Sequence, residues 1–93
     1  MSASVRLLCA DLDAVLKPLG MKSKFVPSDC PDIEDDTIEI RTNAGQLQPV
    51  HVQVNSEGAR MFNVVHEADD GFTFFPQTSK RPPIVAKVKE LLA

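Results

Sequence analysis

Tryptophan and tyrosine are absent from this 93-residue chain, and its longest uninterrupted apolar run is only four residues, at positions 7–10. Such a run is far shorter than the roughly 20 residues needed to cross a bilayer or the roughly 7 to 15 of a signal-peptide core. With 10 Lys and Arg against 13 Asp and Glu, the net charge is -3, so no global positive field attracts nucleic acid or anionic lipid. We therefore expect a soluble, cytoplasmic protein without a membrane contact or an export signal.

Glycine is also scarce, with four in the chain. Gly20, Gly45, Gly58 and Gly71 each fall at a predicted turn or helix end, and neither GxGxxG nor GxxxxGK occurs. Both motifs cradle phosphates with backbone N–H groups. The sequence therefore gives no support for nucleotide binding.

The inventory of thiols and imidazoles is small and consists of Cys9, Cys30, His51 and His66. There is no CxxC and no Cys/His pair at zinc-site spacing. We expect free thiols, because a cytosolic chain is kept reduced. Neither histidine has a nucleophile and a carboxylate in its own segment, as nucleophilic catalysis would need. The sequence therefore predicts no cofactor, no metal and no enzymatic activity.

Hydrophobic residues make up 43% of the chain and charged residues 25%, a composition typical of one folded domain over residues 1–93. Apolar residues at helical spacing predict a helix over about residues 4–19, with Ser2 or Ser4 as its N-cap. Pro18 predicts an irregular last turn or an earlier end, just before Gly20. The apolar stripe of this helix contains Val5, Leu8, Leu12, Val15, Leu16 and Leu19.

Alternating apolar and polar residues predict strands in the middle of the chain. Residues 21–26 form an edge strand with Lys22 and Lys24 facing solvent, and residues 37–75 form an antiparallel meander. Pro82 and Pro83 suit the start of a second helix. The predicted fold class is α+β with two layers: an antiparallel β-meander of four to five strands, with the N- and C-terminal helices packed on one face, in the order α-β-β-β-β-β-α.

The hairpin turns decide which face of the sheet is buried, because a slip of one residue exchanges the faces. A five-residue turn at 55–59 pairs Val52 with Phe62, and a turn at 67–71 pairs Val64 with Phe74. This register makes one face dense in Val and Phe, ready to receive both helices. The opposite face then carries His51, Gln53, Met61, Asn63, Val65, Thr73 and Phe75.

That opposite face mixes polar and apolar side chains, which fits a protein-contact surface. A sheet face that is simply open to water is the alternative. In a register with a four-residue turn, Met61 would point inward and the contact hypothesis would fall. In the preferred register, truncation of Phe75 to alanine weakens the contact and barely affects folding.

Residues 27–36 form the longest predicted loop, which contains two prolines and five carboxylates. Their order lacks the alternate acidic positions, central glycine and closing glutamate of an EF-hand. We expect a solvated acidic loop that steers a basic partner, with weak cation binding as the alternative. The carboxylates are Asp29, Asp32, Glu34, Asp35 and Asp36.

Basic residues gather near both ends of the chain and would form a local patch if those ends adjoin. The patch would consist of Lys22, Lys24, Lys80, Arg81 and Lys87. In element order alone the chain resembles double-stranded RNA-binding domains, and the resemblance implies nucleic-acid binding by this patch. Pro82 and Pro83 stand where that family has a lysine-rich helix start, and the acidic loop would repel phosphates.

Fold does not by itself give function, so the expectation rests on the surface residues. We expect a small non-enzymatic protein-binding domain, of the adaptor, chaperone-like or inhibitor type, that uses the sheet face opposite the helices. Its partner is another protein or a second copy of the chain in a homodimer. A nucleic-acid-binding module that uses the basic patch is the alternative.

Overall fold

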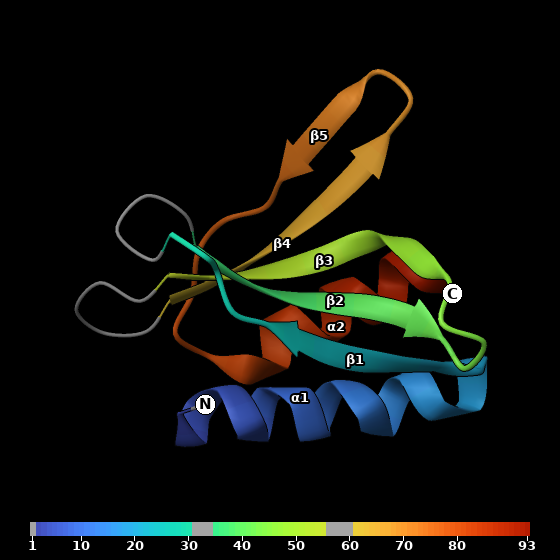
Figure 1. Cartoon of the computed structure of the whole chain (residues 1–93), viewed down its shortest axis with the longest axis horizontal. Coiled ribbons are helices and arrows are strands. Elements are labelled where there is room, and N and C mark those ends of the chain that lie inside the picture. The colour runs from blue at the N-terminus through green and yellow to red at the C-terminus, as the bar shows by residue number, and fades with distance from the viewer. Residues whose placement is uncertain (1, 31–34, 56–60) are drawn as a thin grey trace.

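A five-stranded antiparallel sheet with two helices packed against one face forms the protein (Figure 1). The structure is a computed structural model that describes residues 2–30, 35–55 and 61–93. The strands lie in the order β1-β2-β3-β4-β5, so each strand neighbours the next one in the chain. This is the α+β meander that the sequence predicts. The elements are α1 (Ala3–Leu16), a short 3-10 turn (Lys17–Leu19), β1 (Met21–Val26), β2 (Asp36–Thr42), β3 (Leu47–Asn55), β4 (Met61–Ala68), β5 (Gly71–Phe74) and α2 (Arg81–Leu92).

Helix α1 begins and ends as its sequence predicts. The Ser2 hydroxyl accepts a hydrogen bond from the N–H of Val5, which satisfies a free donor of the first turn. Because Pro18 has no N–H to donate to the carbonyl four residues earlier, the α-helix changes to a 3-10 turn that ends at Gly20 with φ of 73°, although Lys17 itself keeps helical geometry. Leu19, expected in the apolar stripe, belongs to that turn and is exposed.

The hydrophobic core lies between the helices and the inner face of the sheet, as we call the face that the helices cover. Burial of each such side chain contributes about 1.5–3 kcal/mol. Helix α2 has 12 residues, a length that is marginal in isolation, so its docking through Ile84 and Val88 holds it in place. The core consists of Val5, Leu8, Leu12, Leu16, Ile38, Ile40, Val50, Val52, Val54, Phe62, Val64, Ile84 and Val88.

The β2–β3 pair contains one irregularity. Glu39 pairs with His51 and Arg41 with Leu47, so β3 has two more residues than β2 between these positions. Pro49 lies in that stretch and has no register partner in β2 or β4, which suits a residue without an N–H. The irregularity lets β3 begin earlier than the valine alternation alone predicts.

The β3–β4 register differs from the predicted one by two residues. Val52 pairs with Val64 and Val54 with Phe62, so residues 56–60, which lie outside the described residues, connect the strands in place of 55–59. Because side chains alternate with a period of two, an even shift leaves every side chain on its predicted face. The Val-rich face is therefore buried as predicted.

The β4–β5 register is shifted by one residue, which exchanges the faces of β5. Ala68 pairs with Gly71 and Val65 with Phe74, so only Asp69 and Asp70 form the turn. Non-glycine residues of the described chain all have negative φ, and Gly71 takes the positive φ of 130°. This combination is typical of a type I turn followed by a glycine, a tighter connection than the predicted turn at 67–71.

Candidate protein-contact surface

A shallow hollow lies on the outer face of the sheet, as we call the face opposite the helices. Its volume is about 240 Å³. Strands β3, β4 and β5 supply its lining, and Val65 in the middle is only 1% exposed. The residues that line this outer-face hollow are His51, Gln53, Val65, Phe72 and Phe74.

The apolar side of the hollow comes from strand β5. Phe72 and Phe74 are 57% and 62% exposed, and their ring centroids lie 6.2 Å apart with the rings tilted by 39°. Phe74 stands directly opposite Val65, so both side chains project from the outer face. Figure 1 shows the β4–β5 hairpin extending beyond the layer that the helices cover. Two aromatic rings therefore stand in solvent next to a buried aliphatic side chain.

The opposite side of the outer face is charged. Lys24 of β1 pairs with Glu39 of β2, and Glu39 pairs with His51 of β3, a residue that lines the hollow. The carboxylate of Glu39 also accepts a hydrogen bond from Nε of Arg41 at 3.0 Å. The outer face thus changes from charged on β1 and β2 to apolar on β4 and β5, the mixture expected of a contact surface with a polar rim.

His51 is the titratable group of the hollow. Burial lowers the pKa of its imidazole below the ordinary value, and the nearby carboxylates of Glu67 and Glu39 act in the opposite direction. At neutral pH the ring is therefore uncharged, with one nitrogen as a donor and the other as an acceptor. It offers directional hydrogen bonds beside the two phenylalanines.

Two residues predicted for the contact surface, Thr73 and Phe75, lie elsewhere because of the shift in β5. Thr73 pairs with His66 and projects from the inner side of the hairpin. Phe75 packs against the hydrophobic core, and Nζ of Lys87 lies 5.0 Å from its ring centroid. The expectation that both residues share a face with Val65 is wrong, because the two-residue turn changes the parity of the pairing.

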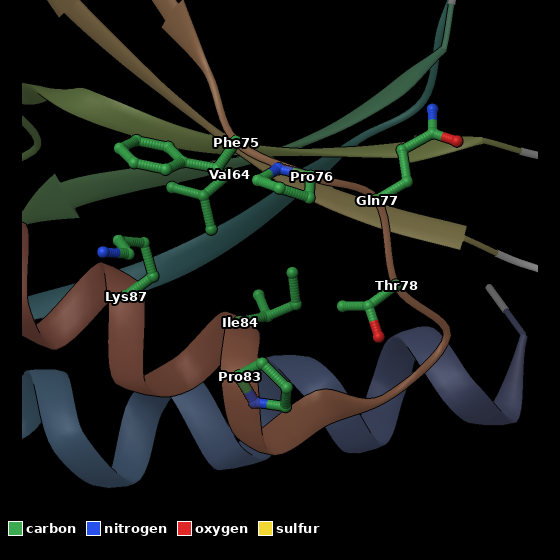
Figure 2. Close-up of a pocket in the computed structure, with 8 residues that line it drawn as sticks. All are labelled: Val64, Phe75, Pro76, Gln77, Thr78, Pro83, Ile84 and Lys87. Atoms are coloured by element: carbon green, nitrogen blue, oxygen red, sulfur yellow. The ribbon is translucent and has the colours of Figure 1, made fainter.

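Phe75 lines a second hollow, which lies on the inner side of the sheet. It has a volume of about 230 Å³ and lies between α2 and the segment that follows β5. Figure 2 shows Phe75 beside Lys87, with Pro76 and Val64 across the space from Ile84. We call this space the proline groove; its lining consists of Val64, Phe75, Pro76, Gln77, Thr78, Pro83, Ile84 and Lys87.

The remaining predicted contact residues lie on the outer face as expected. His51 and Gln53 line the hollow, and Asn63, which pairs with Gln53, is buried at 4% exposure. Met61 lies at the start of β4, opposite Asn55, and is half-buried. Sequence reasoning missed Phe72 and Phe74, although the triplet Asp69–Asp70–Gly71 is a signal for a tight turn that would have placed them here.

The acidic loop is only partly described. Asp32 and Glu34 lie outside the described residues, whereas Asp29 and Asp35 are exposed. Asp36 opens strand β2, and its carboxylate accepts a hydrogen bond from the N–H of Ser28 at 2.8 Å. This carboxylate therefore closes the connection between β1 and β2, a structural role in addition to any effect on a partner.

The basic patch is not assembled as predicted. Lys22 and Lys24 are exposed on the outer face of β1, while Lys80 is the N-cap of α2 and Arg81 and Lys87 belong to α2, on the inner side. Arg81 pairs with Asp11 of α1 at 3.3 Å, and Lys87 pairs with Glu90 at 2.9 Å. The residues thus lie on opposite faces, and two of them have acidic partners. The separated residues are Lys22 and Lys24 on one face and Lys80, Arg81 and Lys87 on the other.

Groups suited to chemistry are dispersed. Among the residues that the structure describes, no group of three or more His, Cys, Asp or Glu side chains is placed to hold a metal ion. Cys9 and Cys30 are both free thiols. Burial raises the pKa of the Cys9 thiol, with the Ser23 hydrogen bond acting against it and Asp13 adding to it. Cys9 is therefore mainly protonated at neutral pH, the less nucleophilic form.

Comparison with known proteins adds no relative. No protein-family model, no curated protein and no solved structure matches the chain. In the described parts of the chain, none of the helices has the length and apolar character that crossing a bilayer requires. The outer-face hollow therefore has to be interpreted from its own residues.

Proposed function

We propose that this protein is a non-enzymatic protein-binding domain and that the outer-face hollow is its contact surface. The observation that carries the proposal is the exposure of Phe72 and Phe74 at 57% and 62% beside Val65. Exposed aromatic residues grouped around a hollow are typical of binding hot spots, whereas isolated exposed residues need no explanation. The polar side of the outer face supplies hydrogen-bonding groups for a rim around them.

The structure of the hollow favours a protein partner over a small ligand. Strands β3, β4 and β5 supply its lining and continue into the open surface of the sheet, and the rings of Phe72 and Phe74 are mostly exposed to solvent. Flat, partly aromatic surfaces of this kind match protein interfaces, while small-molecule sites enclose most of their ligand. We also propose a cytoplasmic location, which is supported by two free thiols in place of a disulfide.

Replacement of both rings tests the proposal. The double variant Phe72→Ser with Phe74→Ser removes the apolar side of the hollow, and Leu7→Ser, at an α1 residue that is 52% exposed, is the matched control. The tagged protein is used to capture partners from native lysate and from cells that also produce an untagged copy of the chain. We expect the wild type and Leu7→Ser to retain the same partner and the double variant to lose it.

A hot-spot ring contributes about 1–3 kcal/mol to binding, so Phe72→Ser or Phe74→Ser alone should weaken binding about fivefold or more. Circular dichroism should give the double variant the same melting temperature as Leu7→Ser. Equal capture by the double variant and the wild type, with the fold intact, would contradict the proposal.

A further inference from the structure

Strand β5 is an open edge of the sheet. The N–H of Phe75 donates to the carbonyl of Val64 at 2.9 Å, so the residues of β5 that hydrogen-bond to β4 are those an even number of positions from Phe75. Antiparallel pairing alternates strictly in this way. The N–H and C=O groups of Phe72 and Phe74 therefore point away from β4, and no described residue pairs with them.

The other edge of the sheet, β1, is protected. The carboxylate of Asp13 on α1 accepts hydrogen bonds from the N–H and the hydroxyl of Ser23, each at 2.8 Å. Lys22 and Lys24 flank this position and are exposed. Helix coverage and lysines are the usual means by which an edge avoids pairing with another strand. Strand β5, with the sequence Gly-Phe-Thr-Phe, has neither.

The open edge is complementary to itself. We infer that β5 pairs in antiparallel fashion with β5 of a second copy of this chain, around a two-fold axis between the two Thr73 residues. This inference goes beyond the proposed function, because it concerns the backbone edge of β5, whereas the outer-face hollow uses the side chains of Phe72 and Phe74. Phe72 then stands opposite Phe74 of the second copy, and each such pair exchanges two hydrogen bonds through the outward N–H and C=O groups.

Other two-fold registers use this edge less well. Pairing Phe74 with itself places Phe72 opposite Pro76, which has no N–H to donate. Pairing Phe72 with itself places Phe74 opposite Asp70, which lies in the turn. Only the Thr73-centred register employs all the outward groups of the strand. It also aligns the outer faces of both copies, because directly opposed residues project to the same side.

The distribution of charge fits this arrangement. Glu67, Asp69 and Asp70 gather at the turn before β5, whereas Lys87 lies against Phe75 at the far end. Antiparallel pairing sets Gly71 opposite Phe75 of the second copy. The acidic turn of each copy therefore lies near Phe75 and Lys87 of the other copy. The two acidic turns are kept apart, as a self-complementary interface between chains of net charge -3 requires.

Charge substitution at the axis tests the inference. Thr73 is exposed and projects from the inner side of the hairpin, so Thr73→Lys and Thr73→Glu are compatible with the monomer fold. Like charges directly opposite each other destabilise a cross-strand pair. By light scattering over a hundredfold concentration range, we expect the wild type to dimerise and each variant alone to dimerise at least tenfold more weakly. An equimolar mixture of the two variants should recover the dimer.

The outcomes separate this inference from the proposed function. A wild type that is monomeric at every concentration overturns the edge pairing, while capture of a foreign protein by the outer face remains testable by the Phe72 and Phe74 double variant. A dimer that is lost in that double variant but unchanged in Thr73→Lys overturns the edge pairing and supports the outer-face contact. Recovery of the dimer in the mixture supports the edge pairing, because only a shared axis brings the two substituted positions together.

Discussion

The carboxylate of Asp13 on α1 accepts two hydrogen bonds from Ser23 on β1, one from the backbone N–H and one from the hydroxyl, both at 2.8 Å. The Ser23 hydroxyl also lies 3.4 Å from the carbonyl oxygen of Cys9, one turn earlier in α1. A helix side chain thereby replaces the neighbouring strand that β1 lacks. This contact ties the N-terminal helix to the edge of the sheet.

We expect Asp13→Ala to destabilise the protein by about 1 kcal/mol, the usual net contribution of such a hydrogen bond. The same change opens the β1 edge, so the variant should also aggregate at lower concentration. Urea unfolding measures the first effect and light scattering the second. Asp13→Asn retains an acceptor oxygen and should lie between the wild type and Asp13→Ala; equal stability of all three proteins would show that the contact contributes nothing.

Adjacent phenylalanines on and after β5 should respond in opposite ways to truncation. Phe75 packs against the core and carries the Lys87 cation over its ring, so Phe75→Ala should destabilise the fold by about 2 kcal/mol. Phe74 is 62% exposed, and Phe74→Ala should change stability by less than about 0.5 kcal/mol. Chemical denaturation of both variants measures the difference. A larger loss of stability in Phe74→Ala than in Phe75→Ala would instead support the register predicted from the sequence.

The fold could be predicted because strong local signals agree with one another. The alternation of Val50, Val52 and Val54 has one apolar face, and an error of two residues in the β3–β4 pairing leaves that face unchanged. Ser2 marks a helix start through its side-chain hydroxyl, and Pro18 and the two prolines in the first turn of α2 mark helix ends through their missing N–H groups. Hydrophobic pattern and capping therefore suffice for the order of the elements and for the core.

The outer-face hollow could be predicted only in part, because it depends on the parity of one short turn. In the sequence, either Phe72 and Phe74 or Thr73 and Phe75 could face outward, since three of the four residues 72–75 are phenylalanine. The choice rests on whether Asp69 and Asp70 alone form the turn, a difference of a few residues in loop length. Strands β3 and β4 fix His51, Gln53 and Val65 independently of that turn, so these side chains lie on the outer face as the alternation predicts.

The pH dependence of stability provides a test of the environment of His51. Its pKa in the folded protein lies below the ordinary value, mainly through burial, so the unfolded chain binds a proton more readily. The contribution of the uncharged ring to stability is fully present above the ordinary pKa of a histidine and is lost progressively as the pH falls from that value through the lowered pKa of the folded protein. We therefore expect the wild type to lose more stability between pH 7.5 and pH 5.5 than His51→Gln.

Urea unfolding of both proteins at the two pH values measures this difference, and the comparison cancels the titration of groups that both proteins share. Gln53→Ala changes a neighbouring side chain of the same hollow that does not titrate, so it should retain the pH dependence of the wild type. If His51→Gln and the wild type lose equal stability on acidification, the ring is as well solvated in the folded protein as in the unfolded chain. The half-buried position of His51 against the apolar side of the hollow favours the opposite result.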